Sequence, residues 1–447
     1  MKTVAQLSGL LRKGKVDAVD LTDQVLESIA AYGDQALFID VLGDRARKEA
    51  RASRKRHRSG AALGTLDGIP LGWKDLFDIK GRVTTAASIV LKSNPPASAD
   101  AGLVAAAVRA GAVTTGTLNM TEFAYSGIGL NPHYGTPRNP RDSKVHRAPG
   151  GSSSASAAVV AAGLLPAAIG TDTGGSIRIP ASFNGVVGYK SSTGRYPMAG
   201  VFPLSRSLDT LGPLANTVED CAIIDAVLGG WKKAATISSM RGLEFVVPKN
   251  VVFDGAQDEV RANFEKSLAR LSKAGAKIKH LTVPAFDAIL QLNASRGHLL
   301  GAEALHVHWN RVNGPDAERM DQRVLGRLKL AEKMSAVDLV EILQQRQKLI
   351  AETTALLGDA MVLFPSTPHV AMPTAPLEAD QSEFFRANAK TLRNTTLGNF
   401  LDWCGVSMPN GTGEGGMPTG LLISAVHGSD GQLLSVGQRV QQLIEDA

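Results

Sequence analysis

The segment PGGSSSASAAVVAAGLLPAAIGTDTGGSIRIP, from Pro149 to Pro180, places seven serines and threonines and six glycines in a largely apolar stretch. Burying a hydroxyl group without a hydrogen-bond partner costs roughly 1–3 kcal/mol. A row of hydroxyls in a buried segment is therefore either densely hydrogen-bonded or retained for chemistry. The fold class and the neighbouring motifs decide between these two explanations.

The same segment predicts one helix and one strand. From Ser153 onward its alanines, serines and valines suit a tightly packed helix that ends near Gly163. Residues 164–169 then suit a short buried strand, and 186–190 form the next strand-like run.

Helices and strands alternate in the same way along the rest of the chain. Amphipathic helices open it, with a strand and turn at 68–79, a helix at 101–110 and a strand at 113–117. Later strands are expected at 244–247, 277–281, 361–364 and 420–425, and later helices at 260–273, 336–357 and 433–444. This alternation predicts an α/β fold with a central mixed β-sheet covered on both faces by helices. Residues 229–235 are either a seam between subdomains or a loop.

The composition is that of a globular protein. Of the 447 residues, 44% are hydrophobic and 20% are charged, which argues against disordered, collagen-like and coiled-coil classes. The longest apolar run, 157–170, has 14 residues and is interrupted by Gly163 and Pro166, well short of the ~20 residues that cross a bilayer. The first 15 residues lack the apolar stretch of a signal peptide, so we expect a cytoplasmic protein. Cys221 and Cys404 are far apart and are expected to be core thiols.

The net charge of +6 is concentrated in one segment. Residues 45–58 hold eight lysines and arginines against Glu49 alone, a local charge of +7 that leaves −1 for the rest of the chain. Such a run can bind nucleic acid or an anionic surface. No aromatic residue interleaves it to stack bases, so we favour the solvated face of a surface helix that runs from Asp44 as its N-cap to Gly60 past its end.

Two Gly-Gly-Ser elements, Gly150–Ser152 and Gly174–Ser176, point to chemistry. Paired glycines allow the backbone to aim successive N–H groups at one point, so residues 173–176 form a candidate oxyanion hole beside Ser176 as nucleophile. A serine hydroxyl needs a proton acceptor, and no histidine occurs between His146 and His280. A lysine held neutral by burial can take this role, and Lys74 lies among large apolar neighbours.

These residues resemble the amidase signature family, which includes fatty-acid amide hydrolases, bacterial amidases and the A subunit of glutamyl-tRNA amidotransferases. The resemblance covers at least residues 66–220, and five separate motifs carry it: DGIPLGWKDLFD, NMTEFAYSG, APGGSSSASAA, GTDTGGSIRIPASFNGVVGYKSSTG and SLDTLGPLANTVED. It implies one amidase signature domain over 1–447, with a core at about 66–220, a variable pocket region at about 230–400 and C-terminal sheet segments and a helix at 400–447.

The resemblance also implies catalytic roles. Lys74, Ser152 after a cis peptide bond, and Ser176 would form a proton relay, and the backbone N–H groups of Thr173, Gly174, Gly175 and Ser176 would form the oxyanion hole. The family commonly has glycines where this chain has Ser154 and Ala155, so we expect a difference in specificity rather than in the relay.

Candidate substrate contacts surround the relay. Arg178 either binds a substrate carboxylate through its guanidinium or pairs with Asp172 across the turn. Met120 and Tyr125 lie in a loop that borders the acyl pocket in relatives, although either residue is equally compatible with the core. Ser153 and Ser154 are expected to cap the helix that follows, and Ser153 is also a candidate substrate contact.

Other motifs predict no cofactor and no metal. Gly127 and Gly129 could begin a dinucleotide fingerprint, but Pro132 stands in place of its third glycine. His306 and His308 would point in different directions on the helix suggested by residues 302–309, which argues against a metal site.

We therefore predict an amidohydrolase that cleaves a linear carboxamide or carbamoyl compound through an acyl-enzyme. A small-molecule amide is the expected partner, with neither nucleic acid nor membrane, and a homodimer remains open. Two alternatives remain: the A subunit of a tRNA-dependent amidotransferase, and a catalytically silent binding protein that uses the basic helix.

Overall fold

The eleven strands of the described residues form one mixed sheet. The computed structural model describes residues 1–445. The strands are β1 (Phe38–Val41), β2 (Pro70–Lys74), β3 (Val113–Leu118), β4 (Ala167–Asp172), β5 (Val187–Lys190), β6 (Thr210–Ala215), β7 (Glu244–Pro248), β8 (Lys277–Leu281), β9 (Met361–Pro365), β10 (Cys404–Thr412) and β11 (Pro418–Ala425). Their order in the sheet is β1-β3-β2-β4-β6-β5-β10-β11-β9-β7-β8. Neighbours pair in parallel within β3-β2-β4 and β9-β7-β8 and antiparallel elsewhere, which confirms the predicted mixed sheet.

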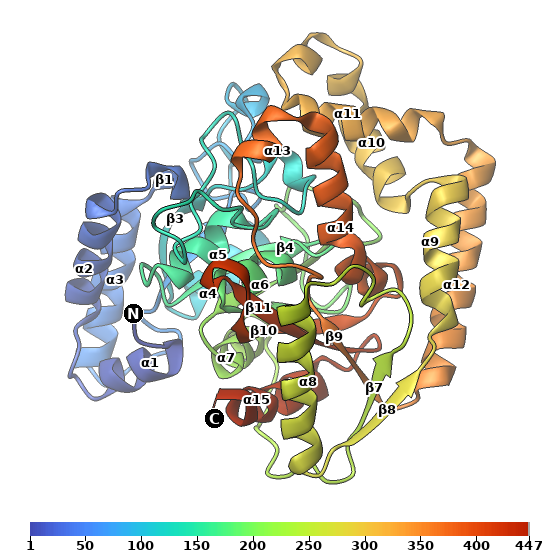
Figure 1. Cartoon of the computed structure of the whole chain (residues 1–447). Coiled ribbons are helices and arrows are strands. Elements are labelled where there is room, and N and C mark those ends of the chain that lie inside the picture. The colour runs from blue at the N-terminus through green and yellow to red at the C-terminus, as the bar shows by residue number, and fades with distance from the viewer. Residues whose placement is uncertain (446–447) are drawn as a thin grey trace.

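Helices cover this sheet (Figure 1). They are α1 (Val4–Arg12), α2 (Ala18–Ala31), α3 (Gly43–Arg58), α4 (Gly102–Arg109), α5 (Ser154–Ala161), α6 (Arg178–Asn184), α7 (Val218–Gly229), α8 (Asp258–Lys273), α9 (Pro284–Arg296), α10 (Leu299–Val312), α11 (Gln322–Leu330), α12 (Ala336–Leu357), α13 (Ala375–Ala379), α14 (Gln381–Phe400) and α15 (Asp430–Glu445).

Strand β5 shows that helices lie on both faces of the sheet. Side chains of successive residues in a strand point to opposite faces. A Cβ atom built on Gly188 would meet Ala181 of α6, whereas the hydroxyl of the next residue, Tyr189, donates a hydrogen bond to Asp430 of α15. Helices α6 and α15 therefore lie on opposite faces, as the α/β prediction requires.

The parallel pair β2 and β4 positions the chemistry-bearing residues. Leu71 lies opposite Ala167 and Trp73 opposite Ile169 in this pair. Because the two strands run in the same direction, their carboxyl ends meet at one edge of the sheet. Lys74 ends β2, and the turn that contains Ser176 follows β4 at that same edge.

Several predicted boundaries match the structure, and some do not. Helix α12 and strand β8 have the predicted ends. Strand β4 begins at Ala167 rather than Leu164, because Pro166 has no N–H group to donate to a ladder. Strand β6 and helix α14 were not predicted. Residues 229–235 lie in the connection between α7 and β7, and strands before and after this connection belong to the same sheet.

The basic segment forms helix α3, and its arginines face acidic side chains. Five of them make ion pairs: Arg45 with Glu49 and Asp100, Arg47 with Asp23, Arg54 with Asp17 and Asp20, Arg56 with Asp67, and Arg58 with Asp17. Much of the local charge is thus neutralised within the fold. The predicted N-cap, Asp44, is the second residue of the helix; Leu42 occupies the cap position and has no capping side-chain bond.

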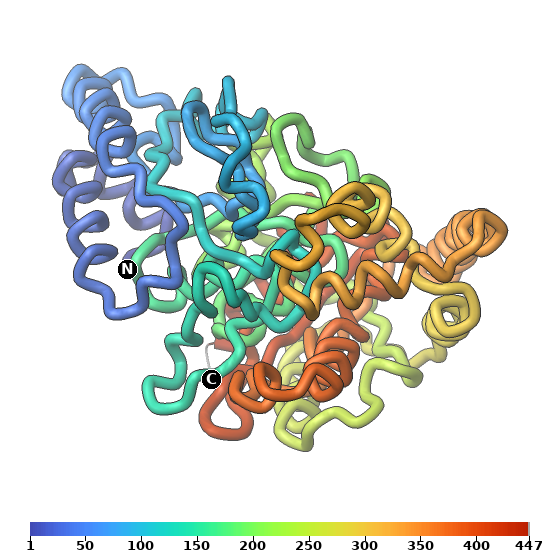
Figure 2. Tube along the Cα trace, turned by 90° about the horizontal axis from the view of Figure 1, so that it is seen from above, coloured from blue at the N-terminus to red at the C-terminus, as the bar shows by residue number. Residues whose placement is uncertain are grey.

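Helices α9 to α12 form an arm beside the sheet. They lie between β8 and β9 in the sequence and contribute no strand. In both views they extend to one side of the molecule, with α12 the outermost (Figures 1 and 2). Across residues 1–445, no helix is both long enough and apolar enough to cross a membrane.

Candidate active site

Lys74 is a fully buried titratable group of the site. Its side chain is inaccessible to solvent, and its Nζ lies 2.7 Å from Ser152 Oγ and 2.7 Å from Thr171 Oγ1. Burial lowers the pKa of Lys74 to about 7, although the negative charges of Asp172 and Asp209 oppose the shift. A large fraction of Lys74 is therefore neutral near pH 7 and can accept a proton.

Ser152 lies between Lys74 and the turn after β4. The Gly151–Ser152 peptide bond is cis, as the family resemblance predicts. The carbonyl of Ser152 accepts a hydrogen bond from Thr121 N–H at 3.1 Å. The next residue, Ser153, donates its N–H to the carbonyl of Ser176 at 3.2 Å, so the two Gly-Gly-Ser elements are directly connected. Among residues 1–445, the structure gives no hydrogen bond between the hydroxyls of Ser152 and Ser176.

The turn at residues 173–176 depends on glycine at position 175. Gly175 has φ +131°, and a Cβ atom on it would overlap the side chain of Thr395 in α14. The Thr395 hydroxyl donates to the carbonyl of Gly174 at 2.7 Å and holds the turn from the other side. Helix α14, far away in the sequence, therefore helps to shape this turn.

The backbone N–H groups of the turn are not equivalent. The N–H of Gly175 donates to Asp172 Oδ1 at 2.9 Å, so it is already engaged. The N–H groups of Thr173, Gly174 and Ser176 have no acceptor within the described part of the chain. Of the four N–H groups predicted to form an oxyanion hole, three therefore lack another acceptor within residues 1–445.

The carboxylate of Asp172 holds the turn through hydrogen bonds to its backbone. It accepts them from the N–H groups of Gly175, Ile177 and Arg178, at 2.9–3.3 Å. Burial alone would raise the pKa of Asp172, but the charge and hydrogen bonds of Arg178 hold this pKa far below its usual range. The carboxylate therefore stays ionised and fixes the start of α6.

Arg178 pairs with Asp172. The sequence left two roles open for Arg178, this pairing and the binding of a substrate carboxylate. Its guanidinium donates to both carboxylate oxygens of Asp172, at 2.9 and 3.0 Å, and also to Asn399 Oδ1. The side chain is 1% exposed. Since its bidentate face is occupied by Asp172, Arg178 holds the turn rather than presenting this face to a substrate carboxylate.

Asp209 is a second buried carboxyl group at the turn. It accepts hydrogen bonds from the hydroxyl of Thr173 at 2.6 Å and from the N–H groups of Leu204 and Ser205. Burial raises the pKa of Asp209 to about 6, although these hydrogen bonds and the charge of Lys74 oppose the shift. Asp209 thus changes charge in the same pH range as Lys74.

A cavity of about 640 Å³ opens onto the turn. Thr173 and Gly174 form part of its wall, and α9, α10, α11 and α14 supply most of the remainder. Most of the wall is apolar. Its polar residues are Tyr125, Thr173, Asn293, His298, Arg327, Asn388, Arg393, Thr396 and Asn399. The cavity is large enough for a small organic substrate whose reacting group reaches the turn.

Of the other predicted substrate contacts, Tyr125, Met120 and Ser153, only Tyr125 lines the cavity. Met120 is fully buried in an apolar cluster with Leu76 and Phe123. Ser153 occupies the N-cap position of α5 without a capping bond; its hydroxyl donates to the Thr171 carbonyl at 3.2 Å. The Ser154 hydroxyl contacts the carbonyl of Asn119, so neither serine caps the helix as predicted.

Several contributors to the site were not predicted from the sequence, among them Thr171, Asn399 and Arg327. Thr171 precedes the recognised turn by two residues and was only part of its motif. Asn399 and Arg327 are more than 140 residues from Ser176 in the sequence, and no motif connects them to it. Both line the cavity beside the turn, and only the placement of α11 and α14 brings them there.

His306 and His308, the histidine pair considered in the sequence, do not form a metal site. Both histidines lie on α10, where His308 is buried and His306 is exposed, so they point in different directions as predicted. Within the chain as described, no group of three or more His, Cys, Asp and Glu side chains is arranged to hold a metal ion.

The sequence is similar to known proteins along almost its whole length. Residues 20–434 match the model of the family described as Amidase. A protein named 2-amino-5-chloromuconic acid deaminase, from Comamonas testosteroni, is 33% identical over 448 residues, which are 99% of this chain and 96% of that protein. The A subunit of the glutamyl-tRNA(Gln) amidotransferase of Cupriavidus necator is 31% identical over 489 residues, 98% of this chain and 96% of its own.

Solved structures share the whole fold. One of them, described as the crystal structure of amidase, superposes with a TM-score of 0.88 at 30% sequence identity. The superposition covers 99% of this chain and 100% of that one.

Proposed function

Because the chain belongs to the amidase family and is thus a hydrolase of amide C–N bonds, we propose that it works through Lys74, Ser152 and Ser176. One observation carries this proposal: a lysine closed off from solvent, with a pKa of about 7, has its Nζ 2.7 Å from Ser152 Oγ. Burial of a charged lysine is unfavourable, and a neutral amine in contact with a hydroxyl is suited to accept its proton.

In the first half of the reaction, Ser176 attacks the substrate. Neutral Lys74 takes the proton of Ser152 as Ser152 takes that of Ser176, and Ser176 Oγ forms a bond to the amide carbonyl carbon. The oxyanion that develops accepts hydrogen bonds from the N–H groups of Thr173, Gly174 and Ser176. Their lack of other acceptors within residues 1–445 supports this role.

In the second half, the proton returns and the C–N bond breaks. Lys74 gives its proton back through Ser152 to the departing nitrogen, and ammonia or an amine leaves. Water then attacks the ester of Ser176, again with Lys74 as the acceptor, and the carboxylic acid is released. Atoms and charge balance without a cofactor or a metal.

The experiment is a screen of primary amides, anilides, carbamates and short carboxylate-bearing amides, scored by release of ammonia or amine. For any substrate found, Ser176→Ala and Lys74→Met are expected to abolish turnover. Hydroxylamine added to the wild-type enzyme should yield the hydroxamate of the acyl group, because it intercepts the Ser176 ester. Turnover that persists in Ser176→Ala at the wild-type rate contradicts the proposal.

A second candidate is the glutaminase component of a tRNA-dependent amidotransferase. The 31% identity to the A subunit of such an enzyme, over 98% of this chain, favours it. In that case the chain alone should be inactive on simple amides, and glutamine hydrolysis should appear only after partner chains are added. Hydrolysis of simple amides by the purified chain alone favours the first candidate.

A further inference from the structure

The cavity beside the turn has a cationic wall. Arg327 of α11 and Arg393 of α14 both line it, as does His298. No aspartate or glutamate in the described part of the chain lines the same cavity. Burial, together with the neighbouring positive charge of Arg327, lowers the pKa of His298, so the two arginines are the positive charges of this wall.

Neither arginine of this wall makes an ion pair within residues 1–445, but the charge of Asp254 acts on Arg393, whereas no carboxylate acts on Arg327 in this way. One N–H of the Arg327 guanidinium donates to the carbonyl of Tyr125, and its plane lies over the Tyr125 ring at 4.2 Å from the ring centroid. Within residues 1–445, no carboxylate lies within ion-pair distance of this group. By contrast, its neighbour on α11, Arg323, pairs with Asp321 at 2.8 Å.

A guanidinium in a partly dehydrated cavity is costly unless something balances its charge. Burial lowers the pKa of Arg327, which reflects this cost. A guanidinium has five N–H donors in a rigid fork that fits a carboxylate. Since the Tyr125 carbonyl uses one donor, the fork retains enough donors for a bidentate contact.

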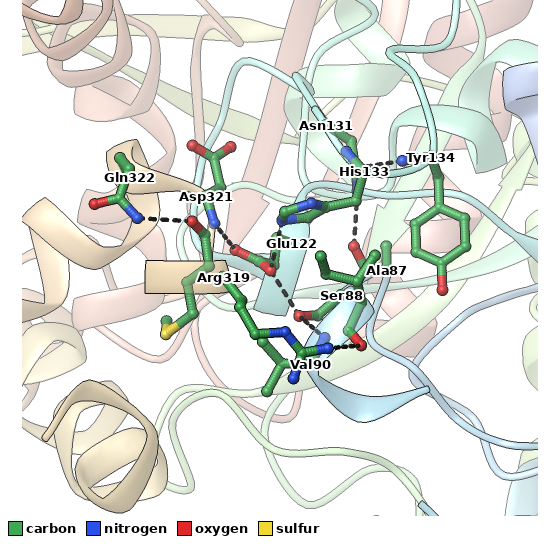
Figure 3. A network of polar contacts seen from close by, with 12 residues as sticks. Ala87, Ser88, Val90, Glu122, Asn131, His133, Tyr134, Arg319, Asp321 and Gln322 are labelled. Carbon is green, nitrogen blue, oxygen red and sulfur yellow. Dashed lines mark hydrogen bonds and ion pairs between the residues drawn. The ribbon is translucent and has the colours of Figure 1, made fainter. Parts of the chain in front are cut away.

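Helix α11 is held in place by a buried carboxylate at its start (Figure 3). Glu122 is inaccessible to solvent; its Oε2 accepts the N–H of Asp321 at 2.6 Å and its Oε1 accepts the hydroxyl of Ser88 at 2.6 Å. His133 Nε2 also lies 3.0 Å from Oε1. Since Glu122 and Tyr125 belong to the same short loop, this network fixes the helix that carries Arg327 against the residue on which Arg327 stacks.

We propose that the substrate amide carries a carboxylate and that Arg327 binds this carboxylate while the amide carbonyl lies at Thr173–Ser176. This inference rests on the proposed function, since it assigns a substrate class to the same site. Arg327 is a specificity-determining residue here and takes no part in the proton relay.

The test compares a charged and a neutral amide of similar length. Succinamate carries a carboxylate, and butyramide has a methyl group in its place. Wild-type kcat/KM should favour succinamate, or another monoamide of a three- to five-carbon dicarboxylic acid, over the neutral analogue. Arg327→Met should lower kcat/KM for the anionic amide roughly 10- to 100-fold, because a hydrogen bond between charged groups contributes about 1.5–3 kcal/mol, and should change the neutral amide less than about threefold.

Two further variants separate recognition from structure. Arg327→Lys keeps the charge without the fork and should retain part of the preference. Lys329→Met removes an exposed positive charge from the same helix and should behave as the wild type. Equal losses on both amides in Arg327→Met, or a wild-type preference for the neutral amide, overturn the inference and leave the proposed hydrolysis standing.

A binding measurement keeps the inference testable without turnover. Calorimetric titration of succinamate and succinate into Ser176→Ala should show binding that is lost in Ser176→Ala/Arg327→Met. If the wild type hydrolyses no amide yet this Arg327-dependent binding is present, the proposed hydrolysis fails and the carboxylate site stands. If none of the three- to five-carbon monoamides binds Ser176→Ala, the carboxylate site is overturned.

Discussion

At the scale of single residues, the proposed relay predicts that the pKa of Lys74 determines how activity depends on pH. Below about pH 7 Lys74 is protonated and cannot accept the Ser152 proton. We expect kcat/KM to rise with pH through an apparent pKa near 7, falling about tenfold per pH unit well below it. Initial rates between pH 5 and 9 measure this profile, and a rate independent of pH over this range contradicts the assignment.

Asp209 provides a control for the origin of that profile. Its negative charge favours protonated Lys74, so it raises the Lys74 pKa. Asp209→Asn should therefore move the rising limb to lower pH, even if kcat falls through the altered contact with Thr173. A limb that stays in place shows that another group titrates.

Breaking the ion pair of Asp172 and Arg178 should lower stability, and should lower activity without regard to the charge of the substrate. Arg178→Met leaves a buried carboxylate without its counter-ion, and breaking such a pair costs about 3–5 kcal/mol. Urea unfolding should show this destabilisation. Any remaining activity should fall equally on neutral and anionic amides, which distinguishes Arg178 from Arg327. A selective loss on anionic amides would falsify the structural role of Arg178.

The residue types at these positions show what a sequence can and cannot predict. Lys74, Ser152 and Ser176, the residues of the proposed relay, stand in dense motifs, because proton transfer and backbone donors would demand particular residues at fixed spacing. Arg178 was ambiguous because pairing with Asp172 and binding a ligand use the same guanidinium. Arg327 gave no signal, since its role depends on the cavity that tertiary packing creates around it.

At the scale of elements, the turn after β4 requires glycine at position 175. Gly175→Ala would force φ +131° on a residue with a Cβ and push that atom into Thr395. We expect kcat to fall about 10²–10³-fold, because displaced N–H groups no longer face the oxyanion. Gly242→Ala is the matched control: this glycine also has positive φ, at +88°, but no atom lies within 4 Å of the added Cβ. Equal effects on kcat in both variants contradict the prediction.

The contact between Glu122 and α11 gives a second prediction at this scale. Glu122→Leu removes the acceptor of Asp321 N–H and Ser88, and leaving such groups unsatisfied costs about 1–3 kcal/mol. Hydrogen exchange should therefore accelerate at amides 321–330, and KM for anionic amides should rise more than kcat falls. Glu332→Leu, an exposed position just after α11, is the control and should leave both unchanged.

Elements with a strong periodic or apolar pattern were predictable, and those defined by partners were not. Helix α12 matches its prediction because its own sequence pattern marks both of its ends. Strand β6 contains Gly212 and Pro213 and reads as a loop; it is a strand because β4 and β5 flank it. Helix α14 mixes polar and apolar residues, since one side packs on the turn and another lines the cavity.

At the scale of the whole molecule, the sheet joins distant parts of the chain. Strand β10 pairs with β5 on one side and β11 on the other, so the C-terminal hairpin lies between the two halves of the sheet. A fragment of residues 1–240 would expose the edge of β5 and lose Asn399 from the turn. We expect this fragment to aggregate, and the full chain to unfold in one calorimetric transition; a folded, monomeric fragment contradicts this expectation.

The arm of helices α9 to α12 has a consequence for how such an enzyme diversifies. The sheet is complete without residues 284–357, and the proposed proton relay draws no side chain from them. Helices α9, α10 and α11 thus contribute to the cavity wall, including Arg327, without contributing a side chain to the proposed relay. We therefore expect that exchanging residues 284–357 between homologues changes which substrates are accepted more than it changes the chemical step.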